Sequence, residues 1–150
     1  MATVSAPMPG VLVAFTRGLA IFRPLALAYA GVLAWVHRAD MIRPSAAIAT
    51  FAVLAIWSMI ASWRRTITLR MAAIDLTLAS AGIAATSLAY PRATVVAGAL
   101  TLPGIWSSSG VVAAAIAGGT RWGIVGATVI SLADLASVIT PNFGTIQNIV

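Results

Sequence analysis

The sequence predicts an all-α membrane protein, a polytopic helical bundle of five transmembrane helices plus the start of a sixth. Of the 150 residues, 61% are hydrophobic and only 8% are charged, whereas soluble domains carry about 25% charged residues. The few charges separate apolar stretches of about 20 residues, the length that crosses a ~30 Å hydrocarbon core. This composition argues against a soluble enzyme. It also argues against a nucleic-acid-binding protein, because the basic residues do not gather on one polar face.

The first two predicted spans are residues 18–36 and 44–63. Residues 18–36 are apolar apart from Arg23, and residues 44–63 contain no charge. Trp63 at the end of the second stretch is placed like an interfacial anchor. Residues 1–17 are predicted to be a cytoplasmic N-terminal segment, and residues 18–150 a transmembrane domain.

The next two predicted spans are residues 71–90 and 102–119. The fourth span places Pro103 in its first turn, where a missing N–H costs little. Residues 93–101 before it are interpreted as a loop or half-helix. A break at Pro103 that opens a serine-lined cavity is the alternative, because discontinuous membrane helices bind ligands in this way.

The fifth predicted span is residues 122–140, which ends at a cluster of helix-breaking residues, Pro141, Asn142 and Gly144. The chain turns apolar again near residue 145. We interpret this as the entry to a sixth span, so the sequence is expected to be part of a longer protein. A short interfacial tail is the alternative.

The arginines predict the orientation. With the N-terminus inside, six arginines lie on the cytoplasmic side: Arg17, Arg23, Arg64, Arg65, Arg70 and Arg121. Three lie on the outer side: Arg38, Arg43 and Arg92. The positive-inside rule therefore predicts a cytoplasmic N-terminus in a multi-pass protein of the inner (plasma) membrane.

Two charged residues inside the predicted spans lie at the same depth. Arg23 and Asp75 are each about 6 to 8 Å from the cytoplasmic boundary, so an ion pair between them would neutralise two charges that hydrocarbon disfavours. Arg17 and Arg121 are alternative partners for Asp75. The simpler interpretation is that the helix dipole stabilises the aspartate and that the arginine extends to the surface.

Asp134 lies deeper in the predicted membrane. It follows Trp122 by twelve residues, about 18 Å along a span and just beyond the midplane. An acidic residue at that depth normally faces the bundle interior and marks a functional site, or forms a structural hydrogen bond. The candidate partners are uncharged: Ser107, Ser108, Ser109, Thr86 and Ser87.

The remaining features are mostly structural. The tryptophans Trp35, Trp57, Trp63, Trp106 and Trp122 lie near predicted span ends, which is typical of an aromatic belt. No nucleophile lies beside a base, and one histidine with three dispersed aspartates cannot form a metal cluster. The sequence therefore predicts no catalytic residue, no metal and no cofactor in this chain.

Five short motifs in order carry a resemblance to a known family. They are Phe15 to Arg23, Ile74-Asp75-Leu76, Leu102-Pro103-Gly104-Ile105-Trp106, Arg121-Trp122-Gly123 and Ala133-Asp134-Leu135. Together they resemble the N-terminal membrane sensor region of actinobacterial sensor histidine kinases of the MacS type, over about residues 15–150.

The resemblance implies a sensory input module of a two-component system. The implied partners are the lipid bilayer, a second copy through the full-length protein, and a response regulator that a kinase region outside this chain phosphorylates. The candidate sensing or coupling residues are Asp134, Asp75, Arg23, Arg121, Trp122 and Trp106. An accessory subunit of a membrane complex and part of a small transporter remain the alternatives.

Overall fold

The protein, seen in a computed structural model, is a bundle of α-helices. The structure describes residues 9–64, 66–96 and 101–139, and in those ranges there is no strand. The helices are α1 (Pro9–Val36), α2 (Pro44–Trp63), α3 (Leu69–Ala89), α4 (Arg92–Val96), α5 (Ser108–Gly118) and α6 (Thr120–Ile139), with 3-10 turns η1 (Arg38–Asp40) and η2 (Gly104–Ser107). The predicted all-α class is confirmed.

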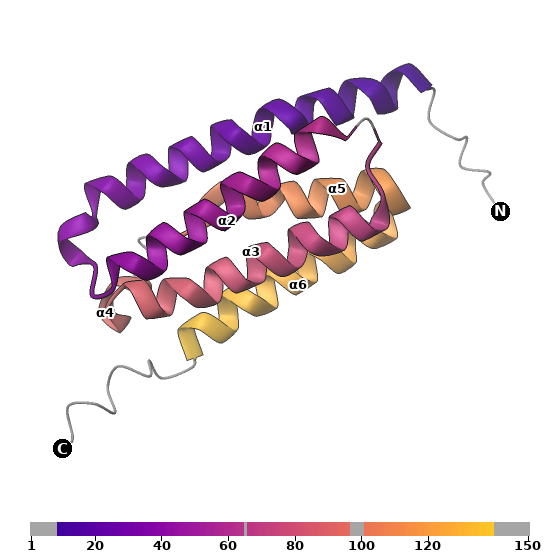
Figure 1. Cartoon of the computed structure of the whole chain (residues 1–150). Coiled ribbons are helices and arrows are strands. Elements are labelled where there is room, and N and C mark those ends of the chain that lie inside the picture. Colours follow the sequence, from indigo (N-terminus) through magenta and orange to yellow (C-terminus); the bar gives the residue numbers. More distant parts are fainter. Residues whose placement is uncertain (1–8, 65, 97–100, 140–150) are drawn as a thin grey trace.

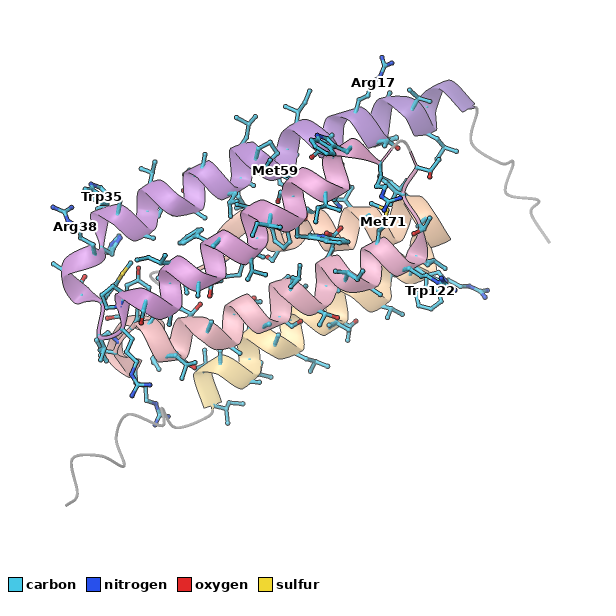
Figure 2. All side chains as sticks on the ribbon, in the orientation of Figure 1. Arg17, Trp35, Arg38, Met59, Met71 and Trp122 are labelled. Carbon is cyan, nitrogen blue, oxygen red and sulfur yellow. The ribbon has the colours of Figure 1, made fainter. Side chains whose placement is uncertain are left out.

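Helix α3 lies at the centre of the bundle. It packs against α2 on one side and against α5 and α6 on the other, while α1 packs against α2, η2 and α5 (Figure 1). Four helices, α1, α2, α3 and α6, are long and apolar enough to cross a membrane. Their outer faces carry large exposed apolar side chains (Figure 2), as expected where lipid rather than water surrounds a helix.

Three predicted spans coincide with long helices. Helix α2 has the predicted bounds, and α3 and α6 each begin two residues before the predicted start. The prediction for α1 is wrong at its start, because the helix begins at Pro9 and runs for 28 residues. The prediction places the boundary at Arg17, yet this residue lies exposed on the helix surface, where a long cationic side chain does not interrupt a helix. The predicted sixth span lies outside the described residues.

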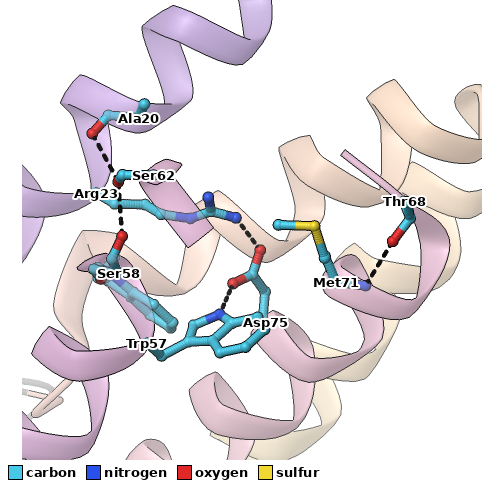
Figure 3. Close-up of polar contacts among 9 residues, drawn as sticks. Ala20, Arg23, Trp57, Ser58, Ser62, Thr68, Met71 and Asp75 are labelled. Carbon is cyan, nitrogen blue, oxygen red and sulfur yellow. Dashed lines mark hydrogen bonds and ion pairs between the residues drawn. The ribbon is translucent and has the colours of Figure 1, made fainter. Parts of the chain in front are cut away.

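Helix α1 continues through a proline. Pro24 has no N–H to donate to the carbonyl of Ala20, one turn earlier. The hydroxyl of Ser62 on α2 lies 3.4 Å from this carbonyl oxygen and 2.7 Å from that of Ser58 (Figure 3). A serine of a neighbouring helix thus partly replaces the missing bond, which is how membrane helices tolerate proline.

The predicted fourth span is not one long helix. Helix α5 has 11 residues, about 16 Å, which is too short to cross a bilayer alone. The chain reaches α5 through a non-helical segment and η2, and the side-chain oxygen of Thr86 on α3 accepts a 2.9 Å hydrogen bond from the buried backbone N–H of Leu102. Four long helices are present in the described ranges, and the count of five spans is not confirmed.

Two glycines set the sharp turn and the close contact between α5 and α6. Gly119 ends α5 with φ of +79°, a conformation that favours glycine. A Cβ atom on Gly123 would lie 2.9 Å from the Cβ of Ala115, so the two helices touch closely there. This turn directs α6 back along α3.

Candidate functional site

The helical register brings one arginine and one aspartate into the core. On α1, Arg23 occupies a buried stripe of otherwise apolar residues, Leu19, Ala26, Ala30 and Ala34. On α3, Asp75 lies in a similar stripe between Ala72 and Ala79. The spacing of three and four residues places each set on one helix face, and the small alanines allow the backbones to approach closely. Arg23 is 2% exposed and Asp75 is fully buried.

Asp75 receives a hydrogen bond on each of its two carboxylate oxygens. The Nη2 atom of Arg23 donates to Oδ2 and forms an ion pair, and the indole Nε1 of Trp57 on α2 donates to Oδ1 (Figure 3). The ion pair considered from depth is therefore present. The simpler interpretation, in which the arginine extends to the surface, is wrong, because Arg23 is buried. The opposite charges and the second donor, the indole, compensate the cost of removing both charged groups from water.

A second buried hydrogen bond adjoins the ion pair. Trp106 of η2 is fully buried, and its Nε1 donates to the hydroxyl of Ser58 on α2 over 3.0 Å. Ser58 follows Trp57 in the sequence, so the two bonds share one turn of α2. We call Arg23, Trp57, Ser58, Asp75 and Trp106 the polar cluster. It joins α1, α2, α3 and η2 inside the bundle.

One edge of the polar cluster has donors without a partner. The Nε of Arg23 and the hydroxyl of Ser109 on α5 are buried and make no hydrogen bond with any residue in the described ranges. Ser109 precedes Gly110, where a Cβ atom would lie 3.2 Å from the Cβ of Asp75, so α5 passes directly beside the aspartate. A bidentate arginine binds a carboxylate through Nε and one Nη together. Arg23 uses only its Nη2 atom.

Asp134 contradicts the expectation of an inward-facing acid. It is exposed on α6, whose buried residues are Gly123, Gly126 and Ile130. Ala133 packs against the core, and the next residue lies about 100° further around the helix. The serine and threonine candidates do not reach it. The Ser137 hydroxyl donates a 2.7 Å hydrogen bond to the backbone carbonyl of Asp134.

The tryptophans divide into two groups. Trp35, Trp63 and Trp122 are 67%, 84% and 49% exposed near helix ends, as an aromatic belt requires. The belt interpretation is wrong for Trp106 and Trp57, which donate to buried partners. The other candidates, Arg121 and Trp122, lie exposed at the start of α6 and do not join the polar cluster.

Sequence reasoning missed two members of the polar cluster, Trp57 and Ser58. It named Trp106 as a candidate residue but placed it in the aromatic belt rather than in the core. A signal existed in α2, where the buried residues Leu54, Ser58 and Ala61 share a helical face, and a serine on a buried face needs a partner. The Leu102-Pro103-Gly104 break was also a signal. It makes the chain enter the bundle and brings Trp106 to its centre.

The arrangement fits helix packing better than acid–base catalysis. Both oxygens of Asp75 already accept hydrogen bonds, so the carboxylate is not poised as a general base. In the ranges that the structure describes, no group of three potential metal ligands comes together.

The fold and the polar cluster indicate the class of α-helical membrane proteins with a buried charged pair. The chain belongs to a family of unknown function, DUF5931, whose model matches residues 9–150. No curated protein and no solved structure matches the chain.

Proposed function

We propose that this chain is the membrane-embedded sensory input module of a two-component sensor histidine kinase. The resemblance of its five motifs to the membrane region of such kinases supports the proposal. The observation that carries it is the polar cluster, because one buried ion pair fixes the position of α1 relative to α3. A membrane signal that shifts α1 must rearrange this pair, and α6, which packs on α3, would pass the shift onward.

The polar cluster has a second arrangement within reach. Asp75 now divides its oxygens between Trp57 and one nitrogen of Arg23, while the Nε of Arg23 is unpartnered in the described part of the chain. If Oδ1 left Trp57, it would bind Nε, and the pair would become bidentate. Two discrete arrangements of a packed interior are the physical basis of a switch.

The proposed topology has a cytoplasmic N-terminus and five crossings, one of them discontinuous. Helices α3 and α6 run in the same direction in Figure 1, so the segment that contains α4, η2 and α5 returns the chain to the arginine-rich end. The chain has no cysteine. We therefore predict that Thr66→Cys reacts with an impermeant maleimide only after the cytoplasmic face is opened, and that Ala39→Cys reacts in intact cells. The reverse labelling would overturn the orientation.

The function is tested in the full-length protein encoded by the reading frame that contains these residues. Trp57→Phe removes one hydrogen bond to Asp75 and keeps the ion pair. A buried bond of about 1 kcal/mol shifts a two-state equilibrium about fivefold. We expect the basal autophosphorylation rate in lipid vesicles to change about fivefold, whereas Trp35→Phe, at an exposed position, leaves it unchanged.

Two results would contradict the proposal. One is a full-length protein that incorporates no phosphate from ATP, which would exclude the kinase. The other is an unchanged rate in Trp57→Phe alongside a normal wild-type rate, which would remove the polar cluster from signalling while leaving the kinase in place.

A second candidate function is a subunit of a larger membrane complex. The observation that favours it is Asp134, an exposed carboxylate within an apolar helix. A charged residue at the centre of a lipid-facing helix costs about 2.5 to 3.5 kcal/mol on insertion scales. Asp134 lies close to that depth, so a helix of a partner protein would cover it. Purification of the full-length protein in mild detergent distinguishes the two, because only the subunit function requires a different protein at fixed stoichiometry.

A further inference from the structure

Two arginines at the N-terminal end of the bundle line a single pocket. Arg17 of α1 and Arg64, directly after α2, border a hollow of about 440 Å³. Its other lining residues come from the same two helices: Val13, Thr16, Ala20, Ser62 and Trp63. Neither guanidinium forms an ion pair or a hydrogen bond with any residue that the structure describes. Two arginines thus border one pocket, and neither has a partner among the described residues.

A second hollow continues from the first along the groove between α1 and α2. It measures about 530 Å³ and shares Ala20, Ser62 and Trp63 with the arginine pocket. Further along, its lining is apolar apart from Ser58, and includes Pro24, Leu27, Ala28, Ala55 and Met59. Figure 2 shows Met59 where α2 faces α1, and Arg17 nearer the start of α1. The two hollows form one site with a basic mouth and an apolar groove.

The dimensions of this site match one leaflet of a bilayer. The groove follows α1 from Ala20 to Ala28, about 12 Å of helix, and one leaflet contributes about 15 Å of hydrocarbon. The mouth lies at the end of α2, where Trp63 is 84% exposed and occupies the usual position of an interfacial tryptophan. The arginines are therefore at headgroup depth and the groove at acyl-chain depth.

We propose that this site binds an anionic phospholipid. The phosphodiester lies between Arg17 and Arg64, and one acyl chain lies in the groove between α1 and α2. A headgroup without a cation fits best, because the ammonium of a zwitterionic lipid would meet two guanidinium groups. Basic pockets between membrane helices recognise anionic headgroups in this way.

The site is independent of the proposed kinase function, since it requires only that the bundle lie in a bilayer. Ala20 and Pro24, which line the groove, flank Arg23 on α1. A bound acyl chain therefore contacts the turn of α1 that carries the buried ion pair.

Native mass spectrometry of the purified full-length protein tests the site. We expect one tightly bound phosphatidylglycerol and at least tenfold weaker binding of phosphatidylcholine with the same acyl chains. The double substitution Arg17→Gln and Arg64→Gln should weaken phosphatidylglycerol binding roughly 30-fold, about fivefold for each arginine. The matched control, Arg70→Gln with Arg121→Gln, removes the same charge from the same end of the bundle, but neither residue lines the pocket.

Two further measurements distinguish a lipid phosphate from a free phosphate ion. Ala28→Phe fills the groove, and should weaken the diacyl lipid while leaving the melting temperature unchanged. Displacement of the lipid by millimolar inorganic phosphate would identify a free anion as the ligand and overturn the proposal. Equal affinity for phosphatidylglycerol and phosphatidylcholine would also overturn the proposal. So would an equal loss of phosphatidylglycerol affinity in the two double variants, because it would show a general effect of charge.

Discussion

Replacing Arg23 with leucine is expected to lower the free energy of unfolding by about 3 to 5 kcal/mol. The substitution leaves the carboxylate of Asp75 fully buried with one neutral donor, the indole of Trp57. A charge without its counter-charge is costly in a protein interior, and surrounding hydrocarbon gives it no route to water. The net contribution of the ion pair to stability is far smaller than this loss, because the loss reports the cost of leaving the Asp75 carboxylate buried without a counter-charge.

The measurement is a titration of purified protein from mild detergent into sodium dodecyl sulfate, followed by circular dichroism. Arg43→Leu is the matched control, because that arginine is exposed and makes no side-chain cap bond at the start of α2. The double variant Arg23→Leu with Asp75→Leu should recover most of the loss. A single variant as stable as the wild type would show that the ion pair does not hold α1 against α3.

The sequence predicted the depth of residues better than the direction in which they point. Charge-free stretches gave the bounds of α2 closely, and helical rise alone placed Arg23 level with Asp75. Depth does not specify which face of a helix a residue occupies. The same arithmetic placed Asp134 near the midplane, but the expectation that it faces the bundle interior was wrong. On α6 the glycines Gly123 and Gly126 form the contact face, and this choice depends on close packing against α5 and α3.

The path of the chain before α5 was the least predictable part of the fold, although Pro103 and Gly104 marked a possible break. Hydropathy counts residues 102–119 as one apolar stretch, whereas the α-helix begins only at Ser108. Before it, Thr86, sixteen residues earlier, accepts the backbone N–H of Leu102. Such a partner is brought near only by folding. For the same reason Trp106 resembled a belt residue in the sequence, since its hydrogen bond to Ser58 spans 48 residues.

Replacing Trp106 with alanine should cost about 3 kcal/mol, the second large effect that the structure predicts. This indole belongs to the central buried cluster together with Ala26 of α1, Leu54 of α2, Ile83 of α3 and Ile130 of α6. Removing it leaves a cavity that these helices cannot fill by moving, because other contacts hold them. This cost lies at the low end of the usual range for a buried tryptophan replaced by alanine. In a bilayer the unpacked apolar group is solvated by lipid rather than water, so the substitution loses mainly packing contacts.

A second substitution at this position separates packing from hydrogen bonding. Trp106→Phe keeps most of the ring volume and removes only the donor to Ser58, so we expect a loss of about 1 kcal/mol. Trp35→Ala is the control, because that indole is 67% exposed and lies 4.5 Å from the guanidinium of Arg38, a contact worth about 0.5 to 1 kcal/mol. Equal losses in Trp106→Ala and Trp35→Ala would mean that Trp106 faces lipid, and would place η2 outside the bundle core.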